Sequence, residues 1–63
     1  MTVFDVSVYK KDGSLWKSFT KDDYYDVLRL TDDWKMQPGT GRIVVVGKLE
    51  GRVAQVVEDW RVN

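Results

Sequence analysis

The chain has 63 residues, ten of them basic and ten acidic, and contains neither cysteine nor histidine. A domain this small buries only about 60% of the surface that its unfolded chain exposes, so we expect a single domain over residues 1–63 that is stabilised by self-association. Without Cys or His, disulfides, Cys–His nucleophilic sites and the common zinc sites cannot form, and a formal net charge of zero argues against a dedicated nucleic-acid binder.

The N-terminal residues 1–5 enter a strand pattern at once and lack the charged start and apolar run of a secretory signal. No apolar stretch approaches the roughly 20 residues that cross a bilayer. The lack of cysteine also fits a reducing compartment. The sequence therefore predicts a cytoplasmic protein without a membrane partner.

Residues 3–9 alternate between apolar and polar side chains, which is the period of a half-buried strand. Its apolar face carries Phe4, Val6 and Val8. The dipeptide Asp12-Gly13 follows, and it favours a two-residue type I′ turn because both residues tolerate a positive φ. Pairing outward from that turn sets Tyr9 opposite Trp16, on the face away from Phe4.

Thr20 and the acidic residues after it are typical of a helix N-terminus, because the hydroxyl caps a free backbone N–H and the acids oppose the helix dipole. Pro38 ends the helix, since the residue before a proline avoids helical geometry. The pattern predicts a helix over residues 21–36. Its core-facing stripe consists of Tyr24, Val27, Leu28, Leu30, Thr31 and Trp34. Its opposite face is acidic and carries Asp22, Asp26 and Asp33.

Residues 43–46 are all β-branched, which predicts the most buried strand of the fold. Glu50-Gly51 predicts a second hairpin turn. Residues 53–62 fit two structures, because their apolar side chains also satisfy helical spacing. These side chains are Val53, Val56, Val57 and Trp60. We favour a strand, because the preceding strand needs a neighbour and no N-cap precedes a helix here; a second helix is the alternative.

These elements predict an α+β fold, a small four-stranded and mostly antiparallel sheet in ββαββ order with one helix packed on one face. One helix covers only one face, so Tyr9, Trp16 and about half of the C-terminal apolar residues are expected on the uncovered face. Such a patch is too large for a stable monomer, and Tyr and Trp dominate binding hot spots. We therefore expect a homodimer, with Tyr9, Trp16 and Trp60 as candidate partner-binding residues. The alternative is an aromatic pair that only stabilises the hairpin.

The side-chain inventory argues against an enzyme, because His and Cys supply most nucleophilic and proton-transfer chemistry near neutral pH. Neighbouring acids such as Asp32 and Asp33 stay ionised and solvated on an exposed helix. The loop at residues 38–42, Pro-Gly-Thr-Gly-Arg, lacks the Gly-Lys-Ser/Thr ending of a phosphate-binding loop. We expect no catalytic, cofactor-binding or metal site.

The acidic helix face is a second candidate partner-binding surface, in which Asp22, Asp26 and Asp33 imitate the phosphates of DNA. A solvated face is the favoured interpretation, because basic residues interrupt the acidic pattern. A further alternative is a nucleic-acid-binding module, in which Tyr9 and Trp16 stack on single-stranded bases between the lysines and arginines of the strands.

The layout of strand, strand, helix, strand and strand in about sixty residues, with an acidic helix, resembles the small proteins that phages encode to block host enzymes, such as phage inhibitors of uracil-DNA glycosylase. The resemblance is one of size and layout, so no residue role follows from it. It implies a protein that binds and inhibits another protein and that has a phage or mobile-element origin. The sequence thus predicts a non-enzymatic protein-binding module whose partner it does not identify.

Overall fold

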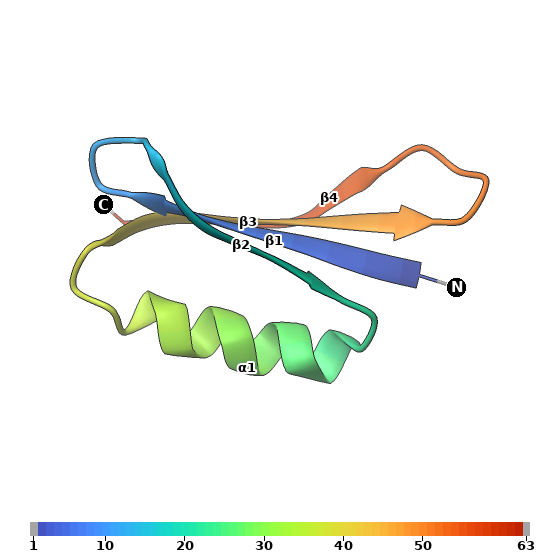
Figure 1. The fold of residues 1–63 in the computed structure, drawn as a ribbon, viewed down its shortest axis with the longest axis horizontal. Coiled ribbons are helices and arrows are strands. Elements are labelled where there is room, and N and C mark those ends of the chain that lie inside the picture. The colour runs from blue at the N-terminus through green and yellow to red at the C-terminus, as the bar shows by residue number, and fades with distance from the viewer. Residues whose placement is uncertain (1, 63) are drawn as a thin grey trace.

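The computed structural model describes residues 2–62 and contains four strands and one helix (Figure 1). Their bounds are β1 Thr2–Lys10, β2 Leu15–Lys21, α1 Tyr24–Lys35, β3 Thr40–Leu49 and β4 Gln55–Arg61. All neighbouring strands are antiparallel, and their order in the sheet is β2-β1-β3-β4. The helix lies along one face of the sheet (Figure 1). The predicted α+β fold in ββαββ order is confirmed.

The core lies between α1 and the two central strands. Its fully buried apolar side chains are Val6, Val8, Val27, Ile43 and Val45. Val6 pairs with Val45 and Val8 with Ile43 across β1 and β3, so both strands present β-branched side chains to the same face of the helix. Of the predicted stripe of α1, Val27, Leu30, Thr31 and Trp34 face this core, whereas Tyr24 and Leu28 are 43% and 37% exposed. The hydroxyl of buried Thr31 donates to the carbonyl of Leu28 at 3.0 Å.

The helix begins later than predicted. Thr20 belongs to β2, where it pairs with Asp5, and the N-cap is Asp23, whose carboxylate accepts from the backbone N–H of Tyr25 at 2.9 Å. Both Thr and Asp are good N-caps, and the long β2 strand takes Thr20 into the sheet. The helix ends at Lys35, shortly before Pro38, as predicted.

The first hairpin turn is not type I′. Gly13 donates to the carbonyl of Lys10 at 3.0 Å, and Lys10 donates to that of Ser14 at 2.8 Å, so the loop has three residues. Gly13 has a φ of +92°, whereas no non-glycine residue of the described chain has a positive φ. This is the arrangement of a type I turn followed by a glycine bulge. The Asp12 carboxylate accepts from the N–H of Ser14 at 2.9 Å and from its hydroxyl at 2.7 Å.

A second irregularity places Trp16 on the helix side of the sheet. Tyr9 pairs with Leu15 and Val8 with Lys17, so Trp16 is an extra residue in a β-bulge. Its ring packs edge-on against Trp34, with 5.1 Å between centroids. The predicted pairing of Tyr9 with Trp16 on the uncovered face is therefore wrong.

The C-terminal segment is a strand, as favoured from the sequence. Trp60 pairs with buried Ile43 and packs against the core. Lys35 of the helix lies over its ring, with 5.7 Å between the ammonium and the ring centroid, and also binds Glu58 at 2.9 Å. Trp60 thus joins β4 to the helix, and it does not lie on the uncovered face.

Candidate functional site

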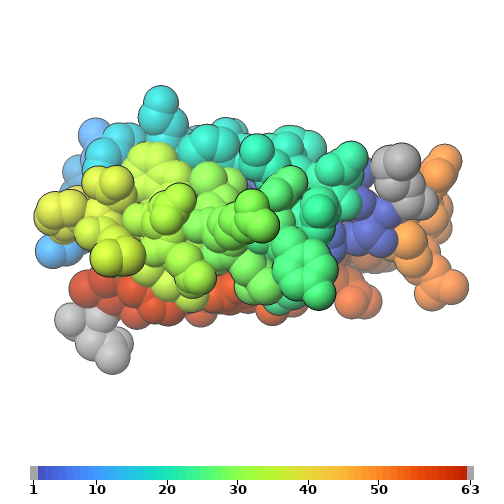
Figure 2. Space-filling view, turned by 90° about the horizontal axis from the view of Figure 1, so that it is seen from below, coloured from blue at the N-terminus to red at the C-terminus, as the bar shows by residue number. Residues whose placement is uncertain are grey.

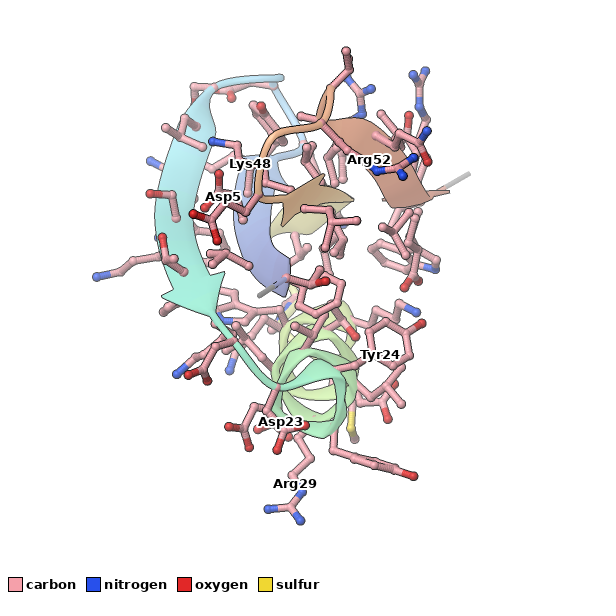
Figure 3. All side chains as sticks on the ribbon, turned by 90° about the vertical axis from the view of Figure 1, so that its right-hand side faces the viewer. Asp5, Asp23, Tyr24, Arg29, Lys48 and Arg52 are labelled. Carbon is pink, nitrogen blue, oxygen red and sulfur yellow. The ribbon has the colours of Figure 1, made fainter. Side chains whose placement is uncertain are left out.

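The uncovered face of the sheet is bridged by ion pairs. The Arg42 guanidinium donates to both carboxylate oxygens of Asp59, at 3.0 Å from Nε and 2.8 Å from Nη2. On β1 and β3, Lys48 binds Asp5 at 2.6 Å, and the two side chains lie close together in Figure 3. The Tyr9 ring lies beneath Arg42, with 5.7 Å to the guanidinium carbon. The apolar patch expected here therefore lacks Trp16 and is interrupted by these ion pairs, although Val56, which pairs with Val46, is 65% exposed.

These ion pairs hold their carboxylates in the charged form. The hydrogen bonds from Arg42 lower the pKa of Asp59 to about 2, against an opposing effect of desolvation and with help from Arg61. The pKa of Arg42 is raised by the same contact. The hydrogen bond from Lys48 lowers the pKa of Asp5. A partner docking here must therefore displace or desolvate paired charges, which is unfavourable.

The three candidate acids, Asp26 and Asp33 on the helix and Asp22 just before it, are exposed but do not form one cluster. Asp22 and Asp26 line the same shallow hollow beside Lys21. Asp33 lies seven residues beyond Asp26, about 10 Å further along the helix axis. Figure 3 shows Arg29 pointing away from the sheet on the outer side of the helix. The structure thus brings Asp22 and Asp26 together and leaves Asp33 apart.

An apolar surface open to solvent lies at the end of the β3–β4 hairpin. A hollow of about 620 Å³ opens there. We call it the hairpin hollow and define it by Phe4, Gly47, Leu49, Arg52, Val53 and Val57. Three of its apolar side chains are well exposed, Leu49 at 44%, Val57 at 46% and Val53 at 85%.

The hollow exists because the helix is shorter than the sheet. Twelve helical residues span about 18 Å, whereas the molecule extends 36 Å along its longest axis. The helix begins at Tyr24, whose ring packs on Phe4 with 5.5 Å between centroids. Seen from the helix side, the start of β1 and the β3–β4 hairpin extend beyond the helix (Figure 2). Apolar side chains past Tyr24 therefore have no helix above them.

A glycine shapes the floor of the hollow. A Cβ built on Gly47 would lie 3.0 Å from a methyl group of Val57 and 3.6 Å from the Phe4 ring. Both side chains therefore close over the position that a larger residue would fill. Gly47 brings these two apolar groups together on the helix side of β3.

A charged side chain, Arg52, lies at the mouth of the hollow. The loop turns at Gly51, which has a φ of +76°, and the backbone N–H of Arg52 donates to the carbonyl of Leu49 at 2.9 Å. After this turn Arg52 lines the hairpin hollow, whereas Glu50 lines a separate hollow with Asp5 and Lys48. Within residues 2–62, neither the Glu50 nor the Arg52 side chain takes part in an ion pair. Figure 3 shows Arg52 at this end of the molecule, on the hairpin above Tyr24.

Of the six candidate residues from the sequence, Tyr9 alone lies on the uncovered face. Trp16 and Trp60 are core-packed, Asp26 and Asp33 lie on the helix, and Asp22 lies in the connection before it. The residues of the hairpin hollow were not recognised from the sequence as a candidate site. Two of them, Val53 and Val57, are assigned to the predicted strand that follows Glu50-Gly51. The predicted lengths gave no signal, because a helix over residues 21–36 and a strand over residues 3–9 both span about 23–24 Å. The mismatch arises from the later start of α1 at Tyr24 and from the greater length of β3, Thr40–Leu49.

Within residues 2–62, no group of three or more acidic side chains is placed to hold a metal ion, and the single helix is too short and too polar to cross a membrane. The chain matches no protein-family model, and no significant match was found among curated proteins or among solved structures.

Proposed function

We propose that this chain is a non-enzymatic, protein-binding module whose partner covers the hairpin hollow. The observation that carries the proposal is the exposure of Leu49, Val53 and Val57 around a concave surface floored by Phe4. Burying apolar surface is worth about 25 cal/mol per Å², so a complementary partner gains stability by covering these side chains. The cytoplasm is the proposed compartment, because a chain without cysteine fits a reducing environment.

The composition of the hollow favours a protein as the partner. Protein interfaces combine an apolar centre with a polar rim, and here an apolar floor is bordered by Thr2, Arg52 and Gln55. The remaining titratable side chains also favour binding over catalysis, because His and Cys are absent and the helix acids are exposed to solvent. Inhibition of another protein is the form of binding that the layout of the chain suggests.

The nucleic-acid alternative has weaker support. Lys48, Arg42 and Arg61 each have a carboxylate within 3.5 Å, so binding phosphates requires breaking those pairs. Trp16, one of the two proposed stacking residues, packs against Trp34 in the core. Tyr9 alone is a poor platform for several bases.

A capture experiment with matched variants tests the proposal. The parent chain, Val53→Lys and Met36→Lys are used as baits in lysate of the source cell, and captured proteins are quantified by mass spectrometry. Val53 and Met36 are 85% and 84% exposed, so the two substitutions add one charge at equally exposed sites. We expect a specific partner to be lost with Val53→Lys and retained with Met36→Lys. Partners that are indifferent to Val53→Lys would contradict the proposed site.

A third bait tests the acidic surface. Replacing Asp22, Asp26 and Asp33 by Lys reverses the charge of the helix and leaves the hollow unchanged. Under the proposal this variant retains the partner. Loss of the partner with the helix variant alone would transfer the site to the acidic face.

A further inference from the structure

We infer that the segment that fills the hairpin hollow is a peptide of another protein in which a large apolar side chain lies next to a carboxylate. The apolar side chain enters the hollow, and the carboxylate binds the Arg52 guanidinium. The inference rests on the proposed function, because it names the chemistry of the partner that covers the same surface.

The hollow is positively charged. Among the described residues that line it, Arg52 is the charged one, and the others are apolar residues, glycines, Thr2 and Gln55. Glu50 lines a separate hollow with Asp5 and Lys48, and Figure 3 shows Arg52 apart from Asp5 and Lys48. A complementary segment therefore carries a negative charge where it meets Arg52.

The Arg52 guanidinium differs from those of the other sheet arginines. Arg42 and Arg61 both have an Asp59 oxygen within 3.5 Å, whereas Arg52 takes part in no ion pair within residues 2–62. A guanidinium presents its donors in a planar fork that matches a carboxylate. An incoming carboxylate can therefore bind Arg52 without breaking an existing ion pair, which the uncovered face of the sheet does not allow.

A turn holds Arg52 beside the apolar walls. Its backbone N–H donates to the Leu49 carbonyl at 2.9 Å, and Gly51, with a φ of +76°, stands at the position where a type II turn requires a positive φ. Leu49 and Val53 line the same hollow as Arg52. One short segment can therefore reach the apolar walls and the cation together.

The openness of the hollow favours a peptide over a small amphiphilic molecule. Sites for small molecules enclose about 70–90% of the ligand surface, whereas here the walls Leu49, Val57 and Val53 are 44%, 46% and 85% exposed. A small carboxylate would leave much of its apolar surface in water, but a segment of a protein covers the walls as well as the floor. Thr2 and Gln55 offer donors and acceptors to its backbone.

Selection from a display library of short random peptides, with the purified chain as bait, tests the inference directly. We expect the enriched peptides to share a large apolar residue with Asp or Glu beside it. Enrichment of basic residues at that place, or no enrichment above a bait-free control, overturns the inference. Amide NMR shifts locate the bound peptide, and we expect them at Gly47, Leu49 and Val57; shifts confined to another surface also overturn it.

Matched variants separate the apolar contact from the charged one, with affinities measured by fluorescence anisotropy of an enriched peptide. Val53→Asn removes an apolar wall without changing the charge and is expected to weaken binding at least about threefold. Met36→Asn is its control, because Met36 is 84% exposed and does not line the hollow. We expect this control to bind within about twofold of the parent. Circular dichroism confirms that each variant folds.

A charge reversal tests the contact with Arg52. Arg52→Glu is expected to weaken an acidic peptide at least about threefold and to favour the same peptide with Lys in place of its acid. Arg29→Glu changes the net charge equally on the outer side of the helix (Figure 3), and it is expected to keep the preference of the parent for the acidic peptide. Equal effects of the two reversals would reduce the contact to long-range attraction and overturn the inference.

The inference and the proposed function can fail separately. Peptides that are lost with Val53→Asn but show no preference for an acid overturn the inference and support the binding module. Peptides and captured proteins that are all indifferent to substitution of Val53 contradict both. Amide shifts of the hollow with decanoate, in the absence of any peptide that binds, assign the hollow to a small amphiphile and overturn the inference.

Discussion

Arg42 and Asp59 form a bidentate ion pair between neighbouring strands, on the face of the sheet that the helix does not cover. Their side chains are joined at 2.8 Å and 3.0 Å, and Arg61 approaches the same carboxylate at 3.5 Å. Val44 lies opposite Asp59 in the register. The pair therefore links β3 to the edge strand β4 and covers part of an otherwise apolar row of side chains.

This ion pair predicts that stability falls in acid. The hydrogen bonds from Arg42 lower the pKa of Asp59 from 3.8 to about 2. Because the folded pKa lies below the unfolded pKa, the stabilisation is complete above about pH 4 and is lost as the pH falls toward about 2. We expect Asp59→Asn to lower the melting temperature at pH 7, and the difference from the parent to close near pH 2. Thermal melts followed by circular dichroism measure this.

The matched control is Asp32→Asn, which removes an exposed helix carboxylate that takes part in no ion pair within residues 2–62. It is expected to melt like the parent at both pH values. A difference between parent and Asp59→Asn that stays constant from pH 7 to pH 2 would contradict the assignment.

Trp16 is expected to affect stability and not assembly. Its ring packs against Trp34 and against Gly39, where a Cβ would lie 3.1 Å from the indole. Truncating a packed Trp leaves a cavity, so Trp16→Ala is expected to lower the free energy of unfolding by about 2–4 kcal/mol. Tyr9→Ala, which removes a ring beneath Arg42 on the open face, is expected to lower it by about 1 kcal/mol.

Urea unfolding followed by far-UV circular dichroism compares the two variants without relying on Trp fluorescence. Sedimentation of Trp16→Ala under folding conditions checks the second half of the prediction. A Trp16→Ala variant that is as stable as the parent but sediments as a smaller assembly would indicate that Trp16 lies at an interface.

The fold could be predicted because its strongest signals are local. Alternation in β1, the β-branched run in β3, the acidic helix start and Pro38 each fix an element from neighbouring residues alone. The C-terminal strand was the hardest, because its apolar spacing also fits a helix. The decisive fact is a tertiary one, since β3 has a free edge that β4 occupies.

The side on which Trp16 lies could not be predicted, because one residue of register decides it. Asp12-Gly13 suits both a two-residue turn and a three-residue turn with a glycine bulge. The three-residue turn shifts the pairing by one residue, so that Tyr9 lies opposite Leu15. The bulge at Trp16 then brings the strands back to the expected register, with Val8 opposite Lys17. The bulge turns the indole toward Trp34, a contact that lies 18 positions away in the sequence and leaves no local signal.

The turn at Gly13 gives a third prediction. Its φ of +92° is unfavourable for any residue with a Cβ, although no atom lies within 4 Å of the position. Gly13→Ala is therefore expected to lower the free energy of unfolding by about 1 kcal/mol through backbone strain alone. Gly13→Asn is expected to lose less, because Asn tolerates the left-handed region. Equilibrium urea unfolding ranks the three proteins, and an alanine variant as stable as the parent would contradict a requirement for positive φ.

Gly41 is expected to be the least replaceable glycine of the sheet, for a different reason. A Cβ built there would lie 2.7 Å from the Lys11 Cα and 2.8 Å from the Lys10 carbonyl oxygen, which are backbone atoms of the first hairpin. These atoms cannot move aside without disturbing the turn, so Gly41→Ala is expected to lower the free energy of unfolding by about 1–3 kcal/mol.

Gly47→Ala is the matched control, because the atom nearest its Cβ is a methyl group of the exposed Val57 side chain at 3.0 Å. Relief of glycine entropy in a strand offsets that contact by about 0.5–1 kcal/mol, so Gly47→Ala should stay within about 1 kcal/mol of the parent. Urea unfolding at low protein concentration separates the two, and equal losses would show that close backbone approach at Gly41 does not limit stability.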